Sequence, residues 1–160
     1  MQKLRFIVPF LGLVVAAFAV ASISASASST SSSTNLNVSV PSTITMTGIA
    51  ASYTASIPAG TTFDEMVGPA VITTNNATGY SLTVASNGDF VAGSHSFPAA
   101  NDQVSAGGGT PGSLSTTPFL IAQSGAAGTD TLPLHNSITV PPTQPGATYT
   151  LVETYVASTN

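Results

Sequence analysis

Apolar and polar residues alternate in several short stretches of this chain. In the first of them, residues 36–40, three apolar side chains are separated by Asn37 and Ser39, and Pro41 follows. A repeat of two places successive side chains on opposite faces of a strand, so we predict a half-buried strand that ends at Pro41. Similar runs bounded by Gly, Pro or Asn predict further strands at residues 43–47, 53–57, 67–74 and 119–121.

The clearest local pattern lies at residues 79–91. Tyr80, Leu82 and Val84 alternate with small polar residues, which predicts that these three side chains face the core. Asn87-Gly88 follows, and both residues tolerate the positive φ of a type I′ turn. We therefore predict a β-hairpin over residues 79–91.

The last apolar run covers residues 149–157. Tyr149, Leu151 and Tyr155 share one face, whereas Val152 and Val156 point to the other. Apolar residues on both faces predict a strand inside a sheet rather than at its edge. Between residues 92 and 118 the alternation weakens, and a run of glycines at 107–109 predicts a long loop.

These patterns define the fold class. Beyond the N-terminal segment, no apolar repeat of 3.6 residues is longer than one turn, and β-branched residues are abundant. Short strands separated by turn residues every eight to twelve positions or so predict an all-β protein. We expect a single antiparallel β-sandwich, immunoglobulin-like or jelly-roll-like, at residues 35–160.

The N-terminus has the pattern of an export signal. Lys3 and Arg5 precede an apolar run at residues 6–20, and small residues follow up to Ala27. This order is typical of a secretory signal peptide, which we place at residues 1–27. A flexible Ser/Thr-rich linker is predicted at residues 28–34. The predicted location is therefore secreted, either extracellular or associated with the cell surface.

The charge pattern excludes several partners. Only 5% of the residues are charged, and no Lys or Arg follows Arg5. A chain without fixed positive charge does not neutralise phosphates, which excludes nucleic acid and, once the signal is cleaved, anionic membranes as partners. Low charge favours self-association or contacts with surface or wall components. The absence of Cys excludes a disulfide scaffold and a thiol nucleophile, and it fits a prokaryotic surface protein.

No residue pattern indicates catalysis. His95 and His135 could combine with carboxylates, but their spacing matches no metal site, and Ser94 lies in no nucleophile elbow. We expect both histidines to lie in exposed loops, and we expect the chain to have no catalytic, cofactor-binding or metal-binding residue. The acidic residues considered as their partners are Asp64, Glu65, Asp89, Asp102 and Asp130.

Three further features have simple structural interpretations. Asn87, Asp89 and Asp102 could supply oxygen ligands to calcium, but we favour turn chemistry as the explanation of Asn87 and Asp89. The pair at residues 64–65 is expected in a solvated loop or in the first turn of a short helix. Two N-x-[ST] sequons begin at Asn37 and Asn76 and are candidate glycan sites.

Two segments carry a resemblance to known surface proteins. These are TTNNATGYSLTV at residues 73–84 and PGATYTLVETYVASTN at residues 145–160. They resemble secreted, cell-surface β-sandwich proteins of bacteria, in particular the WxL-type group of wall-associated proteins. The chain has no Trp, so the Trp motif of that group is absent. The resemblance implies a surface β-sandwich and no specific ligand.

Three functions remain open on these grounds. The first is a secreted, non-enzymatic structural or adhesive protein of the cell surface. The second is a pilus or thread subunit that polymerises by donor-strand exchange, in which the Ser/Thr-rich linker is a mobile tether that carries residues 36–40 as the sheet-completing strand. The third is a glycan-binding module in which exposed Tyr or Phe rings stack on sugars.

Overall fold

The computed structural model describes residues 31–160. The predicted signal peptide, residues 1–27, lies outside the described residues. Ser39–Asn160 form one compact unit, and residues 31–38, which belong to a separate one, contain no strand. Within residues 31–160, no helix is long and apolar enough to cross a membrane.

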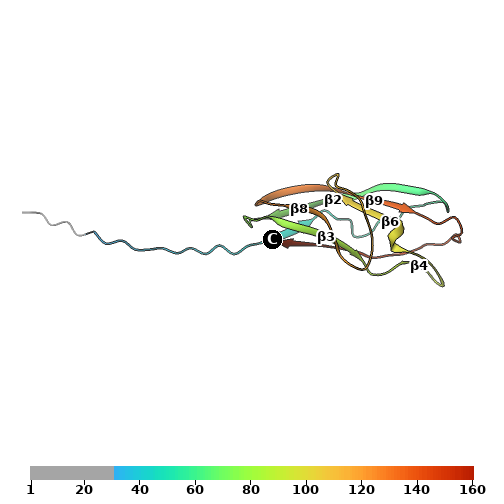
Figure 1. Ribbon diagram of the computed structural model, residues 1–160, viewed down its shortest axis with the longest axis horizontal. Helices are drawn as coiled ribbons and strands as arrows, with labels where there is room; N and C mark the ends of the chain where they lie inside the picture. The colour runs from blue at the N-terminus through green and yellow to red at the C-terminus, as the bar shows by residue number, and fades with distance from the viewer. Residues whose placement is uncertain (1–30) are drawn as a thin grey trace, which may run out of the picture. The chain divides into compact units, whose positions relative to one another are not determined.

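The compact unit is built from antiparallel strands (Figure 1). Their bounds are β1 Ile44–Thr47, β2 Thr62–Thr74, β3 Tyr80–Ser86, β4 Phe90–Ala92, β5 His95–Phe97, β6 Asp102–Ala106, β7 Gly112–Ser113, β8 Phe119–Ser124, β9 Gly128–Thr139 and β10 Glu153–Thr159, with a 3-10 helix η1 at Ala99–Asn101. The protein is therefore all-β with antiparallel sheets, as predicted.

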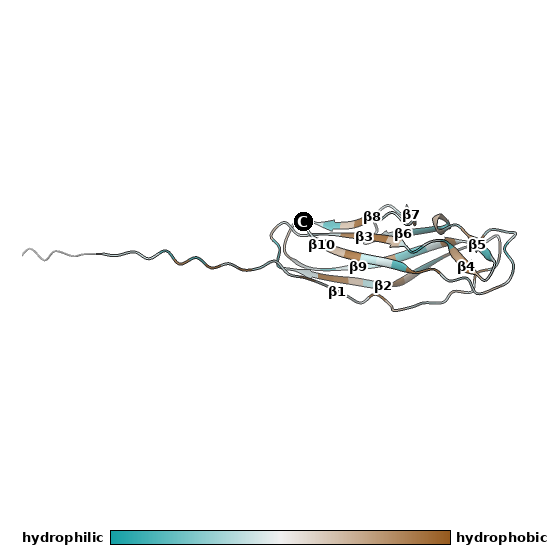
Figure 2. Ribbon diagram, turned by 90° about the horizontal axis from the view of Figure 1, so that it is seen from below, coloured by the Kyte–Doolittle hydropathy of each residue, from teal (hydrophilic) through white to brown (hydrophobic). Residues whose placement is uncertain are grey.

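The strands form three sheets. One has five strands in the order β1-β2-β9-β6-β7, one has three strands in the order β10-β3-β8, and β4 pairs with β5 alone. The long strands β2 and β9 pair from Thr62 opposite Thr139 to Thr74 opposite Gly128, with an irregularity between Met66 and Gly68. In Figure 2 the strands β3, β8 and β10 lie in one layer, and β1, β2 and β9 lie in another.

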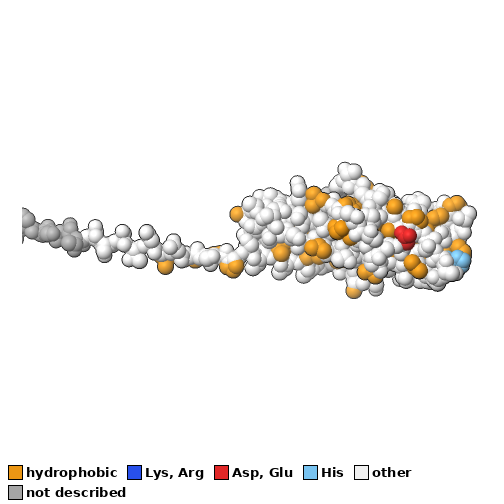
Figure 3. Space-filling view, turned by 60° about the horizontal axis from the view of Figure 1, so that its bottom comes forward, with side chains coloured by type: hydrophobic (Ala, Val, Ile, Leu, Met, Phe, Trp, Pro, Cys, Tyr) orange, Lys and Arg blue, Asp and Glu red, His pale blue; other side chains and the backbone are white. Residues whose placement is uncertain are grey.

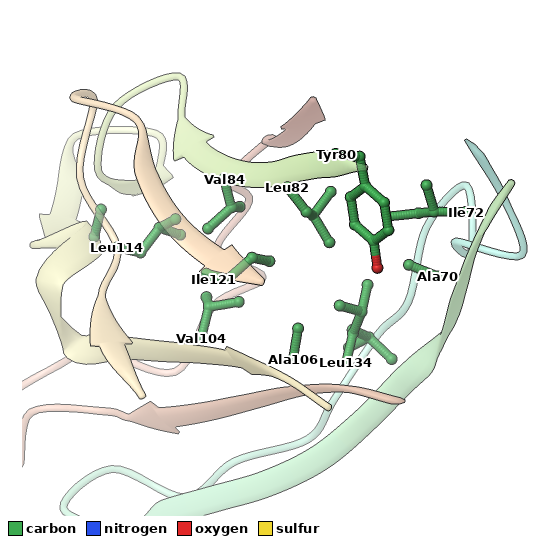
Figure 4. Packing of buried hydrophobic residues seen from close by; sticks show 12 residues of the cluster. Ala70, Ile72, Tyr80, Leu82, Val84, Val104, Ala106, Leu114, Ile121 and Leu134 are labelled. Atoms are coloured by element: carbon green, nitrogen blue, oxygen red, sulfur yellow. The ribbon is translucent and has the colours of Figure 1, made fainter. Parts of the chain in front are cut away.

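Both larger sheets contribute to one apolar core. Leu82 and Val84 of β3 are completely buried, and Tyr80 is 2% exposed. Figure 4 shows these side chains directed toward those of Val104 and Leu134 from the five-stranded sheet. The predicted inward face of β3 is confirmed. Burial of this kind stabilises a domain by about 1.5–3 kcal/mol for each large apolar side chain.

The predicted hairpin at residues 79–91 is wrong. β3 does not pair with β4; it lies between β10 and β8, whereas β4 pairs with β5. The Asn87 amide N–H donates to the Val152 carbonyl (3.0 Å), and the Asn87 side-chain Oδ1 accepts from the Val152 N–H (3.0 Å). Asn87 therefore prolongs the contact with the C-terminal segment instead of reversing the chain.

Two predicted strands lack a partner strand. Residues 36–40 have no regular structure, with Leu36 85% exposed and Val38 76% exposed. Residues 53–57 keep the predicted alternation, because Tyr53, Ala55 and Ile57 are half-buried and the residues between them are exposed, but they belong to no sheet. The alternation therefore predicted which side of residues 53–57 is buried, although this segment forms no backbone hydrogen bonds with a neighbouring strand in residues 31–160.

One further expectation is corrected. The C-terminal strand begins at Glu153 and lies at the edge of its sheet rather than inside it, and Val152 and Val156 are about half exposed. The loop predicted at the glycines of residues 107–109 separates β6 from β7, and the weak alternation before it contains β6, a strand that was not predicted and that lies between β9 and β7. β6 was missed because its first inward residue is the polar Asp102.

Candidate functional site

A groove of about 960 Å³ opens along one edge of the compact unit. Its walls are residues 49–59, which follow β1, and residues 144–153 with Tyr155, which lead into and include the start of β10. Val67 of β2, Phe97 of β5 and Ile138 of β9 are buried residues that line its interior. We call this feature the edge groove.

One stretch of each wall of the edge groove forms no backbone–backbone hydrogen bonds with other described segments. Among residues 31–160, no backbone–backbone hydrogen bond joins residues 49–57 to another segment. On the opposite wall, Thr150 forms two such bonds with Val91, and residues 145–149 form none. Residues 49–57 and 145–149 thus lack backbone partners within residues 31–160 and line the groove together with apolar side chains, as at an open sheet edge.

A buried polar cluster lies at the groove. Asp102 of β6 and Asn136 of β9 are completely buried, and Glu153 of β10 is half-buried. Asn136 Nδ2 donates to Asp102 Oδ2 (3.0 Å) and also to Glu153 Oε1. Within the described part of the chain, Asp102 Oδ1 and Asn136 Oδ1 have no hydrogen-bond partner. One amide thus bridges two carboxyl groups from different sheets.

Burial dominates the electrostatics of this cluster. Burial, and then the neighbouring Glu153, raise the pKa of Asp102 to about 8, against the lowering effect of the Asn136 hydrogen bond. Burial and Glu153 also raise the pKa of Tyr155, whose hydroxyl donates to Glu153 Oε2 (2.6 Å). Burial, then Asp102 and Glu153, raise the pKa of Tyr53. Asp102 is therefore mainly a neutral acid at pH 7, suited to hydrogen bonding rather than to charge pairing.

His95 and His135 do not belong to one site. His135 Nδ1 lies 3.8 Å from Asp64 Oδ1, and both side chains are well exposed. His95 is exposed at the start of β5. Both histidines lie on strands, not in the loops expected. In residues 31–160 no group of three or more His, Cys, Asp or Glu side chains is arranged to hold a metal ion.

The candidate calcium ligands have separate partners. Asn87 Oδ1 accepts from the Val152 amide, Asp89 Oδ1 accepts from the Ala99 amide (3.0 Å), and Asp102 belongs to the buried polar cluster. Asp130, the remaining candidate carboxylate, accepts from the Tyr80 hydroxyl (2.9 Å). These carboxyl and amide oxygens are therefore used in internal hydrogen bonds.

Asp64 and Glu65 are consecutive residues of β2, so the expectation of a loop or helix turn was wrong. The two sequons also differ. Asn76 Nδ2 donates to Thr78 Oγ1, Gly79 O and Asn160 O, whereas Asn37 is exposed. The nitrogen that a glycan would modify at Asn76 is thus already used to hold the C-terminus.

Asn136 and Glu153 were not among the residues predicted from the sequence. Asn136 lies on the inward face of β9 between Leu134 and Ile138, as their burial shows. A polar residue in the apolar half of an alternating pattern is the signal that could have identified it. Its partner Asp102 is likewise a polar residue at an inward position, two residues before the buried Val104 on β6. The contact between Asp102 and Asn136, however, depends on the order of the strands in the sheet.

No protein-family model matches this chain, and no curated protein matches it.

Proposed function

We propose that this protein is a secreted, non-enzymatic structural or adhesive protein of a prokaryotic cell surface, folded as a single antiparallel β-sandwich behind a cleaved signal peptide. The core that both larger sheets share supports the sandwich. The order of charged, apolar and small residues at positions 1–27 supports export. The resemblance of residues 73–84 and 145–160 to bacterial surface proteins points in the same direction.

The observation that carries this proposal is a surface with few charges and no Lys or Arg. Residues 31–160 include six carboxyl side chains and no Lys or Arg, and one of the six, Asp102, is buried. Figure 3 shows a face of white polar and orange apolar atoms with very few charged side chains. Such a surface forms neutral hydrogen bonds and apolar contacts, which salt screens little. It suits a wall or an extracellular matrix.

A second candidate function is a subunit of a pilus or thread. The specific observation is the apolar stripe of residues 36–40, where Leu36, Val38 and Val40 are 85%, 76% and 74% exposed. Three exposed apolar side chains at alternate positions form one face of a strand without a partner. A strand of that kind can complete the open sheet edge of another molecule.

Export tests the first candidate. The full chain is expressed in a secreting prokaryotic host, and the extracellular and surface fractions are analysed by intact mass. We expect a chain that begins at Ser28 and remains associated with the surface at high salt. A protein found inside the cell with Met1 retained would contradict the proposal. Size-exclusion chromatography of the mature protein tests the second candidate, for which we expect oligomers whose size grows with concentration.

A further inference from the structure

We propose that the edge groove binds residues 35–40 of a second copy of this chain as an added β-strand. This inference rests on the second candidate function, since it names the acceptor site that such a polymer needs. We call residues 35–40 the donor segment.

The side chains of donor and acceptor match in spacing. Leu36, Val38 and Val40 repeat every second residue, as do Tyr53 and Ile57 with Ala55 between them on the groove wall. Side chains on one face of a strand are about 6.6 Å apart, so the two series have the same spacing. The donor segment also supplies the N–H and C=O groups that residues 49–57 lack as partners.

The charges of the two surfaces also fit. The donor segment NLNVSV has no charged residue. The carboxyl groups that line the groove, Asp102 and Glu153, are already bridged by Asn136. An anionic partner would be buried beside these carboxyl groups, which is costly, whereas a neutral strand is not.

The chain's own donor segment is too closely tethered to fill the groove. Only Pro41 and Ser42 separate Val40 from Thr43, and β1 starts at Ile44. A reversal at residues 41–42 would place residues 36–40 antiparallel to β1, with Leu36 opposite Thr47. The groove wall starts beyond that point, at Ile49. The donor therefore reaches the middle of the groove only from another molecule.

Two matched variants of the mature full-length protein test this inference. One places Asp at the apolar positions (Leu36→Asp, Val38→Asp, Val40→Asp), and the other places Asp at the intervening positions (Asn35→Asp, Asn37→Asp, Ser39→Asp). The two carry the same added charge. We expect the first to remain monomeric and the second to assemble, because burying an unpaired carboxylate is costly. Equal assembly by both would overturn the inference and leave a polymer formed through another surface.

A synthetic peptide of residues 35–43 separates the groove from polymerisation. We expect it to bind the monomeric apolar-position variant, and we expect the same peptide with Asp at positions 36, 38 and 40 to bind at least about tenfold more weakly. The unsubstituted peptide could bind the variant while the wild-type protein forms no polymer. That result would support the groove as a strand-binding site and contradict polymerisation through it. Equal binding of both peptides would overturn the inference.

Disulfide trapping locates the contact, since the chain has no native Cys. A Val38→Cys chain is mixed with an Ala55→Cys chain that also carries the three apolar-position Asp substitutions and thus only accepts. Opposed residues on paired strands lie close enough for a disulfide. We expect a mixed dimer, and none when Leu120→Cys on β8 replaces Ala55→Cys. Equal trapping at both positions would overturn the groove as the acceptor.

Discussion

The strand β3 and the groove wall at residues 49–59 show the same alternation but different structures. In β3 the inward side chains are buried and both backbone edges pair, with β10 and with β8. In the wall, Tyr53, Ala55 and Ile57 are half-buried at the same spacing, yet within residues 31–160 the backbone of this segment forms no hydrogen bond with a strand. Alternation reports which face an apolar core covers. It does not report whether a second strand is present to form the ladder.

The largest expected effect is at the centre of β3. Leu82 is completely buried, so Leu82→Ala should lower the free energy of unfolding by about 2–5 kcal/mol. Thr83 lies on the opposite face, so Thr83→Ala should lower the free energy of unfolding by no more than about 0.5 kcal/mol. Ile57→Ala in the groove wall should cost roughly half of the Leu82 effect or less, because Ile57 is only half-buried.

Urea denaturation of the mature protein measures these three variants. If Thr83→Ala were as damaging as Leu82→Ala, the outer face of β3 would be covered by other parts of the molecule. If Ile57→Ala were as damaging as Leu82→Ala, the groove wall would be part of the core rather than an open edge, and the contrast between the two regions would disappear.

The buried polar cluster gives the next effect. Asn136→Ala removes the amide that donates to both Asp102 and Glu153. We expect a loss of about 1–3 kcal/mol in the free energy of unfolding, since buried acceptors are left without a donor. Ser137→Ala, the next residue on β9, is the control and should change little. An unchanged stability for Asn136→Ala would mean that the two carboxyl groups find other partners.

Stability should also depend on pH through Asp102. Its pKa is about 8 in the folded protein and 3.8 without the fold's influence, so the folded state keeps a proton that the unfolded state loses. Stability should therefore fall as pH rises from about 4 to about 8, by at most about 1.4 kcal/mol per pH unit for one proton. Glu153, Tyr53 and Tyr155 face the same group.

Thermal melts at several pH values check this dependence. The variant Asp102→Asn, which does not titrate, should show a clearly flatter profile over the same range. A wild-type protein whose stability rises steadily between pH 4 and pH 8 would contradict the assignment of Asp102 as a neutral acid.

The smallest effect is expected at the end of β10. Asn76 Nδ2 donates hydrogen bonds to Thr78 Oγ1, Gly79 O and Asn160 O, with donor–acceptor distances of 2.9, 3.0 and 2.8 Å. Asn76→Ala should cost about 0.5–1.5 kcal/mol in a urea titration, as expected for lost hydrogen bonds near the surface. Asn37→Ala in the exposed segment is the matched control and should leave stability unchanged. A larger effect at Asn37 would show that the donor segment is already engaged.

The fold class and the buried face of β3 could be predicted because both depend on local alternation. The partners of each strand could not. Asn87-Gly88 has the local chemistry of a hairpin turn, but its backbone and side chain bond to Val152, which lies far away in the sequence. The buried polar cluster was not predicted for the same reason, since Asp102, Asn136 and Glu153 come from three different strands. Non-local pairing is set by the packing of the whole chain, which no short pattern records.

Residues 49–57 are proposed to form an open edge that another strand completes, in contrast to the fully paired β3. Amide hydrogen exchange on the monomeric apolar-position variant, with and without the peptide of residues 35–43, distinguishes the two regions. We predict fast exchange at residues 50–57 in the free protein, slow exchange in β3 throughout, and clear protection of residues 50–57 when the peptide is added. Slow exchange at residues 50–57 in the free monomer, or no change with saturating peptide, would contradict the proposal.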